Sequence, residues 1–383
     1  MTGALINARI LTPAGLLSGH AVLFEHGRIL AVTADDDPRL AQADTRDLGG
    51  ALLLPGFIDS QVNGGGSVLF NDFPTVEGIR RIGAAHRRFG TTGFLPTLIS
   101  DDLSVVAAGI QAVKAAIAAG VPGVLGIHIE GPFLNQQKKG VHNPAALRVP
   151  DTSVVQQLTS LGTGVTLVTL APEVTTPALL RELRRGGAIL SAGHTNATFA
   201  DIGVALDAGV TGFTHLFNAM SPLGSREPGV VGAALNDPDS WCGIIVDGRH
   251  VDPVVLRIAL RAKRHDRFML VTDAMPSVGT TETSFLLQGR RISVRDGYCV
   301  DESGTLAGTA LTMADAIRNA VRLLGLTLHE AVRMASEYPA AFLGLSGELG
   351  SIKPGYRASF VAADDDLNVL ATWIDGETTG PAG

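Results

Sequence analysis

The chain has 383 residues, of which 45% are hydrophobic and 17% are charged. A chain with this many apolar side chains can bury a large core, which excludes global disorder. Its 30 basic and 37 acidic side chains leave a net charge of −7 and no basic face. We therefore expect neither nucleic acid nor a membrane surface as a partner.

The cysteine content and the first residues restrict the class of protein further. Cys242 and Cys299 are the only cysteines, which excludes a disulfide framework and a Cys-rich metal site. The opening stretch MTGALINARILTPAG lacks the basic and apolar segments of a signal peptide. No run of about 18 apolar residues is present, so no membrane span is predicted. We expect a cytoplasmic protein.

Both ends of the chain have the pattern of short strands. Residues 1–53 contain ALINARILT, HAVLFEHGRILAV and DLGGALLLP, and residues 352–383 contain GYRASFVAAD and NVLATWIDGE. These stretches alternate irregularly, are broken by glycine turns and show no helical period. We predict that the two ends form one small β-sandwich domain beside a main body of residues 54–351. Two unrelated edge flaps are the alternative.

Eight short apolar runs recur through the body, and each ends in polar residues. The runs are LLPGFIDSQ, TTGFLPTLIS, VLGIHIEGP, VTLVTLAPE, AILSAGHTN, VTGFTHLFN, CGIIVDGRH and FMLVTDAM. Most of the gaps between them are amphipathic, and we expect helices at 75–89, 102–119, 151–161, 175–185, 197–208, 253–265 and 312–324. Eight strand–helix units predict an α/β fold of the (β/α)₈ barrel type.

A doubly wound open sheet is the alternative architecture, and it would bind its ligand at a single switch point. The polar strand ends favour the barrel, because a barrel brings all eight ends around one mouth. These polar residues are Asp59, Gln61, Thr97, Glu130, Glu173, His194, His215, Asp247, His250 and Asp273. Residues 281–308 break the pattern and predict a β-hairpin inserted after the eighth strand.

Glu130, His194 and His215 follow the third, fifth and sixth apolar runs. On barrel strands their side chains would point into the same mouth. One carboxylate and two imidazoles are a common ligand set for catalytic Zn²⁺, with a fourth position open for water. A single histidine is more often a hydrogen-bonded core residue, but three matching residues at three strand ends favour a metal site.

Further polar residues near the predicted mouth suggest an acid–base site. Asp273 ends the eighth strand, where a carboxylate can take a proton from water and deliver it to a leaving amine. A helix cap or a strand-end ion pair is the alternative for this residue. His142 lies on a Gly/Pro-marked loop after the third strand and could polarise a carbonyl group. His128 alternates with Glu130, so we expect a structural role for it.

Two cationic groups at the same end suggest a phosphate site. Arg226 lies on the long loop after the sixth strand and His250 follows the seventh. A guanidinium group can bind phosphate through two hydrogen bonds. Lys138 and Lys139 are a second cationic pair nearby, for which surface solvation is the preferred interpretation. The sequence has no P-loop, no GxGxxG at a helix start and no GxSxG elbow.

The order of the motifs resembles one enzyme family over nearly the whole chain. PGFIDSQVNG, GIHIEGPF, KKGVHNP, SAGHTNAT, THLFNAMSP, SREPGVVGA, IIVDGRHVD, VTDAM and GTLAGTALTM occur in the expected order. The chain closely resembles the N-acetylglucosamine-6-phosphate deacetylases of the amidohydrolase superfamily. The resemblance implies hydrolysis of N-acetyl-D-glucosamine 6-phosphate to glucosamine 6-phosphate and acetate, in amino-sugar catabolism.

The resemblance also assigns roles to individual positions. It implies that the metal ligands are Glu130, His194 and His215. It implies that Asp273 is the catalytic acid/base and that His142 binds and polarises the acetyl carbonyl. The substrate-binding positions that it implies are Val141, His142, Asn218, Ala219, Arg226, His250, Leu306, Ala307, Gly308 and Thr309. It implies a homodimer, in which Arg226 would serve either its own site or, preferably, that of the neighbouring subunit.

One departure from the wider superfamily concerns the first strand. Many members carry His-x-His there and bind a second metal ion, whereas this chain has Gln61 and Asn63. Amides are poor Zn²⁺ ligands compared with imidazole, so we expect one divalent ion per subunit, Zn²⁺ above all. An amidohydrolase for cyclic amides or nucleobases and a non-catalytic sugar-phosphate-binding protein are the alternatives. Acceptance of N-acetylgalactosamine 6-phosphate stays open.

Overall fold

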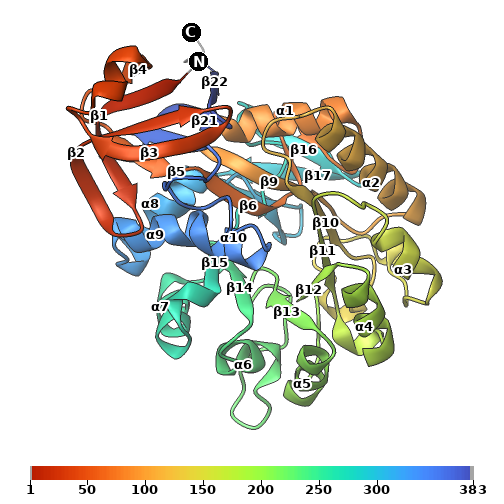
Figure 1. Cartoon of the computed structure of the whole chain (residues 1–383). Coiled ribbons are helices and arrows are strands. Elements are labelled where there is room, and N and C mark those ends of the chain that lie inside the picture. The colour runs from red at the N-terminus through yellow and green to blue at the C-terminus, as the bar shows by residue number, and fades with distance from the viewer. Residues whose placement is uncertain (1, 380–383) are drawn as a thin grey trace.

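The computed structural model describes residues 2–379, and its centre is a parallel barrel (Figure 1). The sheet order is β15-β14-β13-β12-β11-β10-β9-β6, and an isolated parallel bridge between Val62 and Ala274 joins its two ends. The strands are β6 (Phe57–Val62), β9 (Thr91–Leu98), β10 (Gly126–Glu130), β11 (Val165–Leu170), β12 (Ile189–Ala192), β13 (Val210–Phe213), β14 (Trp241–Ile244) and β15 (Phe268–Leu270). Each strand lies within one of the eight predicted apolar runs or extends beyond it by one residue, so the barrel prediction is confirmed and the open sheet is excluded.

Helices surround the barrel, and all seven predicted ones are present. They are α1 (Val76–Arg87), α2 (Leu103–Ala118), α3 (Ser153–Leu158), α4 (Pro177–Arg185), α5 (Phe199–Asp207), α7 (Pro253–Ala262) and α8 (Met313–Leu324). Three further helices were not predicted: α6 (Gly229–Asn236), α9 (Leu328–Ala335) and α10 (Glu337–Phe342). Side-chain caps begin several of them. Thr198, for example, forms a reciprocal capping box with Asp201 at the start of α5.

The main core lies between the barrel strands and the helices. Each helix turns an apolar stripe inward, as α1 does with Ile79 and Ile82, which are both fully buried. Among the described residues, no helix is long and apolar enough to cross a membrane.

The two ends of the chain meet in one eight-stranded sheet. Its order is β22-β21-β20-β5-β1-β2-β3, with β4 paired to β1. The strands are β1 (Gly3–Thr12), β2 (Gly15–Glu25), β3 (Arg28–Ala34), β4 (Asp44–Asp47), β5 (Leu52–Pro55), β20 (Phe360–Ala363), β21 (Val369–Ile374) and β22 (Glu377–Thr379). Phe360 of β20 pairs with Pro55 of β5, which excludes two unrelated flaps. The division of the chain at residues 53 and 352 stays a prediction.

An inserted sheet follows the last barrel strand, where a single hairpin was expected. That expectation was wrong in extent, because residues 281–308 belong to a four-stranded antiparallel sheet. Its strands are β16 (Ser284–Leu287), β17 (Arg290–Arg295), β18 (Tyr298–Val300) and β19 (Leu306–Thr309). Gln288 and Arg290 donate hydrogen bonds to the carbonyls of Ser100 and Val141, which fasten the sheet over the barrel mouth. A small pair, β7 (Gly64–Gly65) and β8 (Val68–Leu69), lies after β6.

Candidate active site

Three predicted site residues adopt a left-handed backbone just after their strands. The φ angles are +50° at His194, +35° at His215 and +51° at Asp273. This conformation is uncommon for any residue with a side chain and costs about 1–3 kcal/mol, so the surroundings must hold it in place. Such strained positions cluster at functional sites. Here they mark the ends of β12, β13 and β15, which all open at the same mouth.

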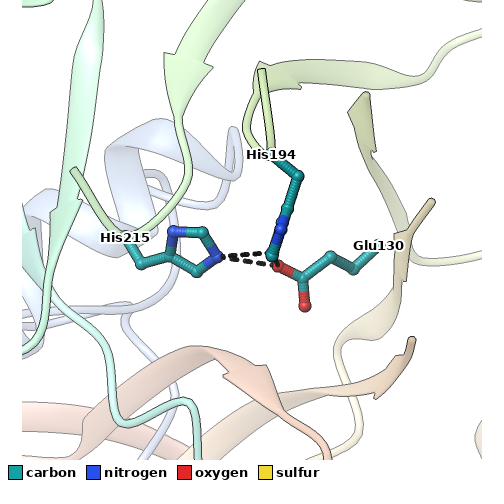
Figure 2. A group of neighbouring side chains, drawn as sticks. All are labelled: Glu130, His194 and His215. Carbon is teal, nitrogen blue, oxygen red and sulfur yellow. Dashed lines mark hydrogen bonds and ion pairs between the residues drawn. The ribbon is translucent and has the colours of Figure 1, made fainter. Parts of the chain in front are cut away.

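Glu130, His194 and His215 lie together at this mouth, as predicted (Figure 2). All three are buried, and their ligand atoms lie within 4.8 Å of one another. The Nε2 atoms of His215 and His194 lie 2.9 and 3.3 Å from Oε1 of Glu130, and 3.1 Å from each other. Three lone-pair donors converging on one point are suited to a divalent cation such as Zn²⁺.

Hydrogen bonds and neighbouring rings set the protonation state of two of these three residues, His194 and Glu130. Nδ1 of His194 lies 2.8 Å from the carbonyl oxygen of Lys138, which can only accept, so Nδ1 carries the proton and Nε2 offers its lone pair. Burial alone would raise the pKa of Glu130. The two imidazole rings beside it, those of His194 and His215, instead hold its pKa well below the ordinary value. Glu130 is therefore an anion at neutral pH.

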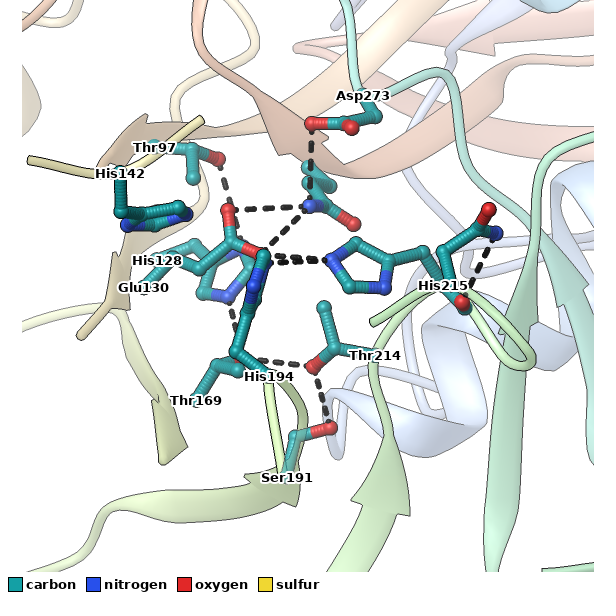
Figure 3. A network of polar contacts seen from close by, with 12 residues as sticks. Thr97, His128, Glu130, His142, Thr169, Ser191, His194, Thr214, His215 and Asp273 are labelled. Atoms are coloured by element: carbon teal, nitrogen blue, oxygen red, sulfur yellow. Dashed lines mark hydrogen bonds and ion pairs between the residues drawn. The ribbon is translucent and has the colours of Figure 1, made fainter. Parts of the chain in front are cut away.

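Asp273 lies beside this group (Figure 3), and two amides hold its carboxylate. Nδ2 of Asn63 and Nε2 of Gln61 donate to its Oδ1 over 2.6 and 3.1 Å. The same Gln61 nitrogen lies 3.2 Å from both carboxylate oxygens of Glu130. Burial, with a contribution from the negative charge of Glu130, raises the pKa of Asp273 to about 6. A carboxylate with this pKa can both accept and return a proton near neutral pH.

His142 is buried near the other side of the same centre, and its ring lies 4.4 Å from that of His194. The backbone N–H of Ser100 donates to Nδ1 of His142 over 3.2 Å, so the proton of the neutral ring lies on Nε2. Burial, with the neighbouring His194, lowers the pKa of His142 well below its ordinary value. The ring is therefore a neutral N–H donor, which is the form needed to polarise a carbonyl.

His128 points away from the mouth into a network of hydroxyl groups (Figure 3). Its Nε2 lies 2.8 Å from Oγ1 of Thr169, which is 2.6 Å from Oγ1 of Thr214. Thr214 in turn bonds to Ser191 over 2.7 Å. Burial lowers the pKa of His128 to about 4, so the ring is neutral. These contacts are those of a structural residue.

The site lies at the bottom of a cavity of about 440 Å³. Of the predicted substrate-binding positions, the cavity wall contains Val141, His142, Asn218, Ala219, His250, Leu306 and Gly308. The wall also contains residues to which the sequence analysis gave no substrate contact: Ile99, Gln137, Lys138, Gly140, Met275, Gly304 and Thr305. Met275 closes the eighth apolar run, and this position could have identified it. Lys138 had been placed near the mouth but was interpreted as a solvated surface residue.

Three predicted positions lie elsewhere in the described part of the chain. Arg226 is exposed on the loop before α6 and does not line the cavity. Ala307 is buried in an apolar cluster under the inserted sheet, also outside the wall. Thr309 is buried as well, and its hydroxyl donates to the carbonyl of Thr272 over 2.6 Å. His250 does reach the wall, with Nδ1 held 2.6 Å from Oδ2 of Asp247.

A carboxylate and two imidazoles at the strand ends of a (β/α)₈ barrel, beside the half-buried carboxyl group of Asp273, define a metal-dependent hydrolase. Residues 52–379 match the Amidohydrolase family, and the chain belongs to that family.

Curated relatives and solved structures share nearly the full length. An N-acetylgalactosamine-6-phosphate deacetylase of Shewanella sp. (strain ANA-3) is 44% identical over 97% of this chain and 94% of its own. An N-acetylglucosamine-6-phosphate deacetylase of Haemophilus influenzae is 36% identical over 98% and 99%. The crystal structure of N-acetylglucosamine-6-phosphate deacetylase from Pasteurella multocida has a TM-score of 0.95 at 36% identity, covering 99% and 100% of the two chains.

Proposed function

We propose that this protein removes the acetyl group from N-acetyl-D-glucosamine 6-phosphate, giving D-glucosamine 6-phosphate and acetate in amino-sugar catabolism. The observation that carries the proposal is the meeting of Glu130, His194 and His215 with Asp273 and His142 in one cavity. The names of the relatives supply the substrate class. A mutant of the deacetylase from Mycobacterium smegmatis, solved with N-acetyl-D-glucosamine-6-phosphate, has a TM-score of 0.90 at 34% identity over 98% of this chain and 99% of its own.

The donor set fits one divalent ion, which we propose to be Zn²⁺. Glu130, His194 and His215 would hold it, leaving a position open for water and substrate. When bound, the ion would activate water and polarise the amide carbonyl.

The chain's own residues would handle the protons and the developing charge. Asp273 accepts a proton from the attacking water, whose oxygen bonds to the amide carbon. The Nε2–H of His142 steadies the negative charge that develops on the carbonyl oxygen. The C–N bond then breaks as Asp273 returns the proton to the amine nitrogen, so that acetate and the free amino sugar leave.

The amides of Gln61 in β6 and of Asn63 just after it support a single ion per subunit. Gln61 and Asn63 turn their nitrogens towards Asp273, and an N–H group cannot ligate a cation. Elemental analysis should find about one ion per chain. The double substitution of Gln61→His with Asn63→His should raise that number towards two. A second ion bound at strand β6 of the unmodified chain would contradict the proposal.

We propose a homodimer in which Arg226 helps to bind the phosphate of the neighbouring subunit's substrate. Three exposed apolar side chains support an interface near this loop: Leu223 (60% exposed) on the loop itself, with Phe199 (39%) and Val204 (50%) on α5. His250 would bind the phosphate from within the same subunit. If Arg226 serves its neighbour, mixing Arg226→Ala with Asp273→Asn subunits should recover activity, because half of the mixed dimers' sites would be intact.

An acetate-release assay on metal-reconstituted protein tests the proposed reaction. N-acetylglucosamine without the phosphate should react with a kcat/KM lower by roughly two to three orders of magnitude, because charge-assisted hydrogen bonds are lost. Arg226→Ala should impair the phosphorylated substrate far more than the plain sugar. Equal losses of kcat/KM on both substrates would mean that Arg226 has a structural role, and Lys138 and Lys139 would then be the next candidates for phosphate binding.

We also propose a cytoplasmic location.

N-acetylgalactosamine 6-phosphate is the second candidate substrate. It is favoured by the name of the 44% identical Shewanella relative. The two sugars differ only in the configuration at C4, so the same acetamide chemistry applies, and parallel kcat/KM measurements will rank them. Turnover of a cyclic amide or a nucleobase instead would support an amidohydrolase with another substrate. Tight binding of the sugar phosphate without acetate release would support a non-catalytic sugar-phosphate-binding protein.

A further inference from the structure

Glu173 ties together two loops that lie beside the metal-binding group. It follows β11 in the short 3₁₀ turn Pro172–Val174, and β11 lies between β10 and β12 in the barrel. A side chain at the end of β11 can therefore reach the loops that follow both neighbouring strands. One of those loops carries Lys138 and the other carries His194.

The carboxylate of Glu173 accepts three hydrogen bonds from these loops. Oε1 accepts from Nδ2 of Asn135 over 2.8 Å and from the backbone N–H of Asn196 over 2.6 Å. Oε2 accepts from the hydroxyl of Thr195 over 2.6 Å. Asn196 also reaches across, because its Nδ2 donates to Oε1 of Gln137 over 3.1 Å.

The loop after β10 also bonds directly to His194 on the other loop. The backbone N–H of Asn135 donates to the carbonyl of His194 over 2.9 Å, and Nδ1 of His194 donates to the carbonyl of Lys138 over 2.8 Å. His194 itself has a φ of +50°, which its neighbours must maintain. The ring direction therefore depends on the relative position of the two loops that Glu173 joins.

We infer that Glu173 is a positioning residue for His194: it holds the loops after β10 and β12 at the spacing that aims Nε2 of His194 at the metal position. The inference rests on the proposed metal site. Groups that orient a metal-ligating histidine typically change metal affinity by about 10–100-fold when they are removed. Glu173 is a step further out, since it acts through Thr195, Asn135 and Asn196 rather than touching the ring.

The test is the affinity for Zn²⁺, measured by competition with a chromogenic chelator. Glu173→Ala should weaken binding by about 10–100-fold. Glu173→Gln should stay within about threefold of the unmodified chain, because its amide oxygen can still accept from Asn135 and Asn196 while its nitrogen donates to the hydroxyl of Thr195. This rescue by the conservative variant separates hydrogen-bonded positioning from a long-range effect of charge.

A matched control is available in the terminal sheet. Asp364, between β20 and β21, also accepts three hydrogen bonds, from the backbone N–H groups of Asp366 and Asn368 and from Nδ2 of Asn368. Asp364→Ala removes a comparable set of bonds far from the cavity and should leave Zn²⁺ affinity unchanged. If Glu173→Ala does not fold, Thr195→Val should still weaken binding measurably, because it removes the hydroxyl that donates to Glu173 and accepts from the backbone N–H of Ala197.

Several outcomes would overturn the inference. Unchanged Zn²⁺ affinity in Glu173→Ala, or in Thr195→Val if that variant replaces it, would do so. Equal loss in Asp364→Ala would show a general effect of stability, and equal loss in Glu173→Gln would show an effect of charge. Failure of the unmodified chain to bind Zn²⁺ would instead overturn the proposed metal set, and the inference with it.

Discussion

The barrel mouth has two halves, and they differ in the kind of polar group that meets there: lone pairs in one half and N–H donors in the other. On the half formed by β10, β12 and β13, a carboxylate and two imidazoles bring lone pairs to one point. On the half formed by β6 and β15, the amides of Gln61 and Asn63 bring N–H groups to the carboxylate of Asp273. Converging lone pairs favour a cation, whereas converging N–H groups favour an anion. The first half is thus suited to binding a metal ion and the second to carrying a proton.

The two halves are also built differently in the backbone. Parallel ladders join β10, β11, β12 and β13, whereas β15 and β6 are not paired in a ladder and an isolated bridge joins Val62 to Ala274 just after β15. The side chain of Asp59 lies between the two strands at this place. Its carboxylate accepts from the hydroxyl and the backbone N–H of Thr272, over 2.5 and 3.3 Å, and from the backbone N–H of Gln61 over 3.2 Å. A buried side chain therefore holds the residues next to Asp273, where the other half uses regular sheet.

The largest expected effect on activity comes from removing the metal ion from the half formed by β10, β12 and β13. Removal of divalent ions by a chelator should abolish acetate release, and added Zn²⁺ should restore it. In the metal-free protein, Asp273→Asn should cause no further loss, because groups that act as a unit are not additive. Activity that persists after complete removal of metal would contradict the division into two halves.

The second largest effect on activity is expected when Asp273, the proposed proton carrier, is replaced and the metal ion is kept. Asp273→Asn keeps the shape of the side chain but cannot take a proton, so kcat should fall by about 10²–10⁴-fold. Metal content should stay that of the unmodified chain, because Asp273 belongs to the other half. Asp364→Asn, far from the cavity, is the control and should retain full activity. A normal kcat in the Asp273 variant would remove this residue from the mechanism.

Asp59, which links β6 to Thr272, should make the free energy of unfolding depend on pH. Burial raises the pKa of Asp59 to about 7 from an ordinary value of 3.8. Folding therefore favours the protonated form, and the stability that this provides is present below pH 4 and is lost as the pH rises to about 7. Between these limits, Asp59→Asn should gain roughly 4 kcal/mol relative to the unmodified chain. Urea unfolding of both metal-free proteins measures the difference, and a constant difference would contradict the assignment.

The smallest effect should come from one amide of the proton-carrying half. Asp273 acts as a base only when it is ionised, so kcat/KM should fall as the pH drops below its pKa of about 6. Gln61→Leu removes an N–H donor that stabilises the ionised form, so the pKa should rise. The acid limb of the pH profile should move up by about one pH unit. An unmoved limb would show that Asn63 alone holds the carboxylate.

The barrel could be predicted because its strands are buried on both faces and so appear as continuous apolar runs. Helix α6 was missed for the opposite reason. Its sequence GVVGAALN has small and apolar residues all around, six of them buried, and therefore shows no amphipathic period. Helix α9 does carry a signal that could have been used, with Thr327 as its cap and Glu330 three residues on.

The convergence of the three candidate metal ligands could be predicted for a simple topological reason. Strand ends of a barrel share one mouth, so Glu130, His194 and His215 were brought together by the fold alone. The contacts of Asp59 with Thr272 and of Glu173 with Thr195 depend on which strands are neighbours and on their register. No local sequence pattern encodes that information.

The pairing of β5 with β20 has a consequence for synthesis of the chain. Phe360 pairs with Pro55, so β5 must wait while roughly 300 further residues are made, or about 15–60 s at usual rates of translation. All eight barrel strands leave the ribosome within that interval. Meanwhile the apolar segment Leu52–Pro55 has no neighbour on one edge, which is the kind of edge that chaperones cover and that aggregates recruit. A chain that ended just before residue 360 would thus contain all eight barrel strands but leave this edge of the sheet open.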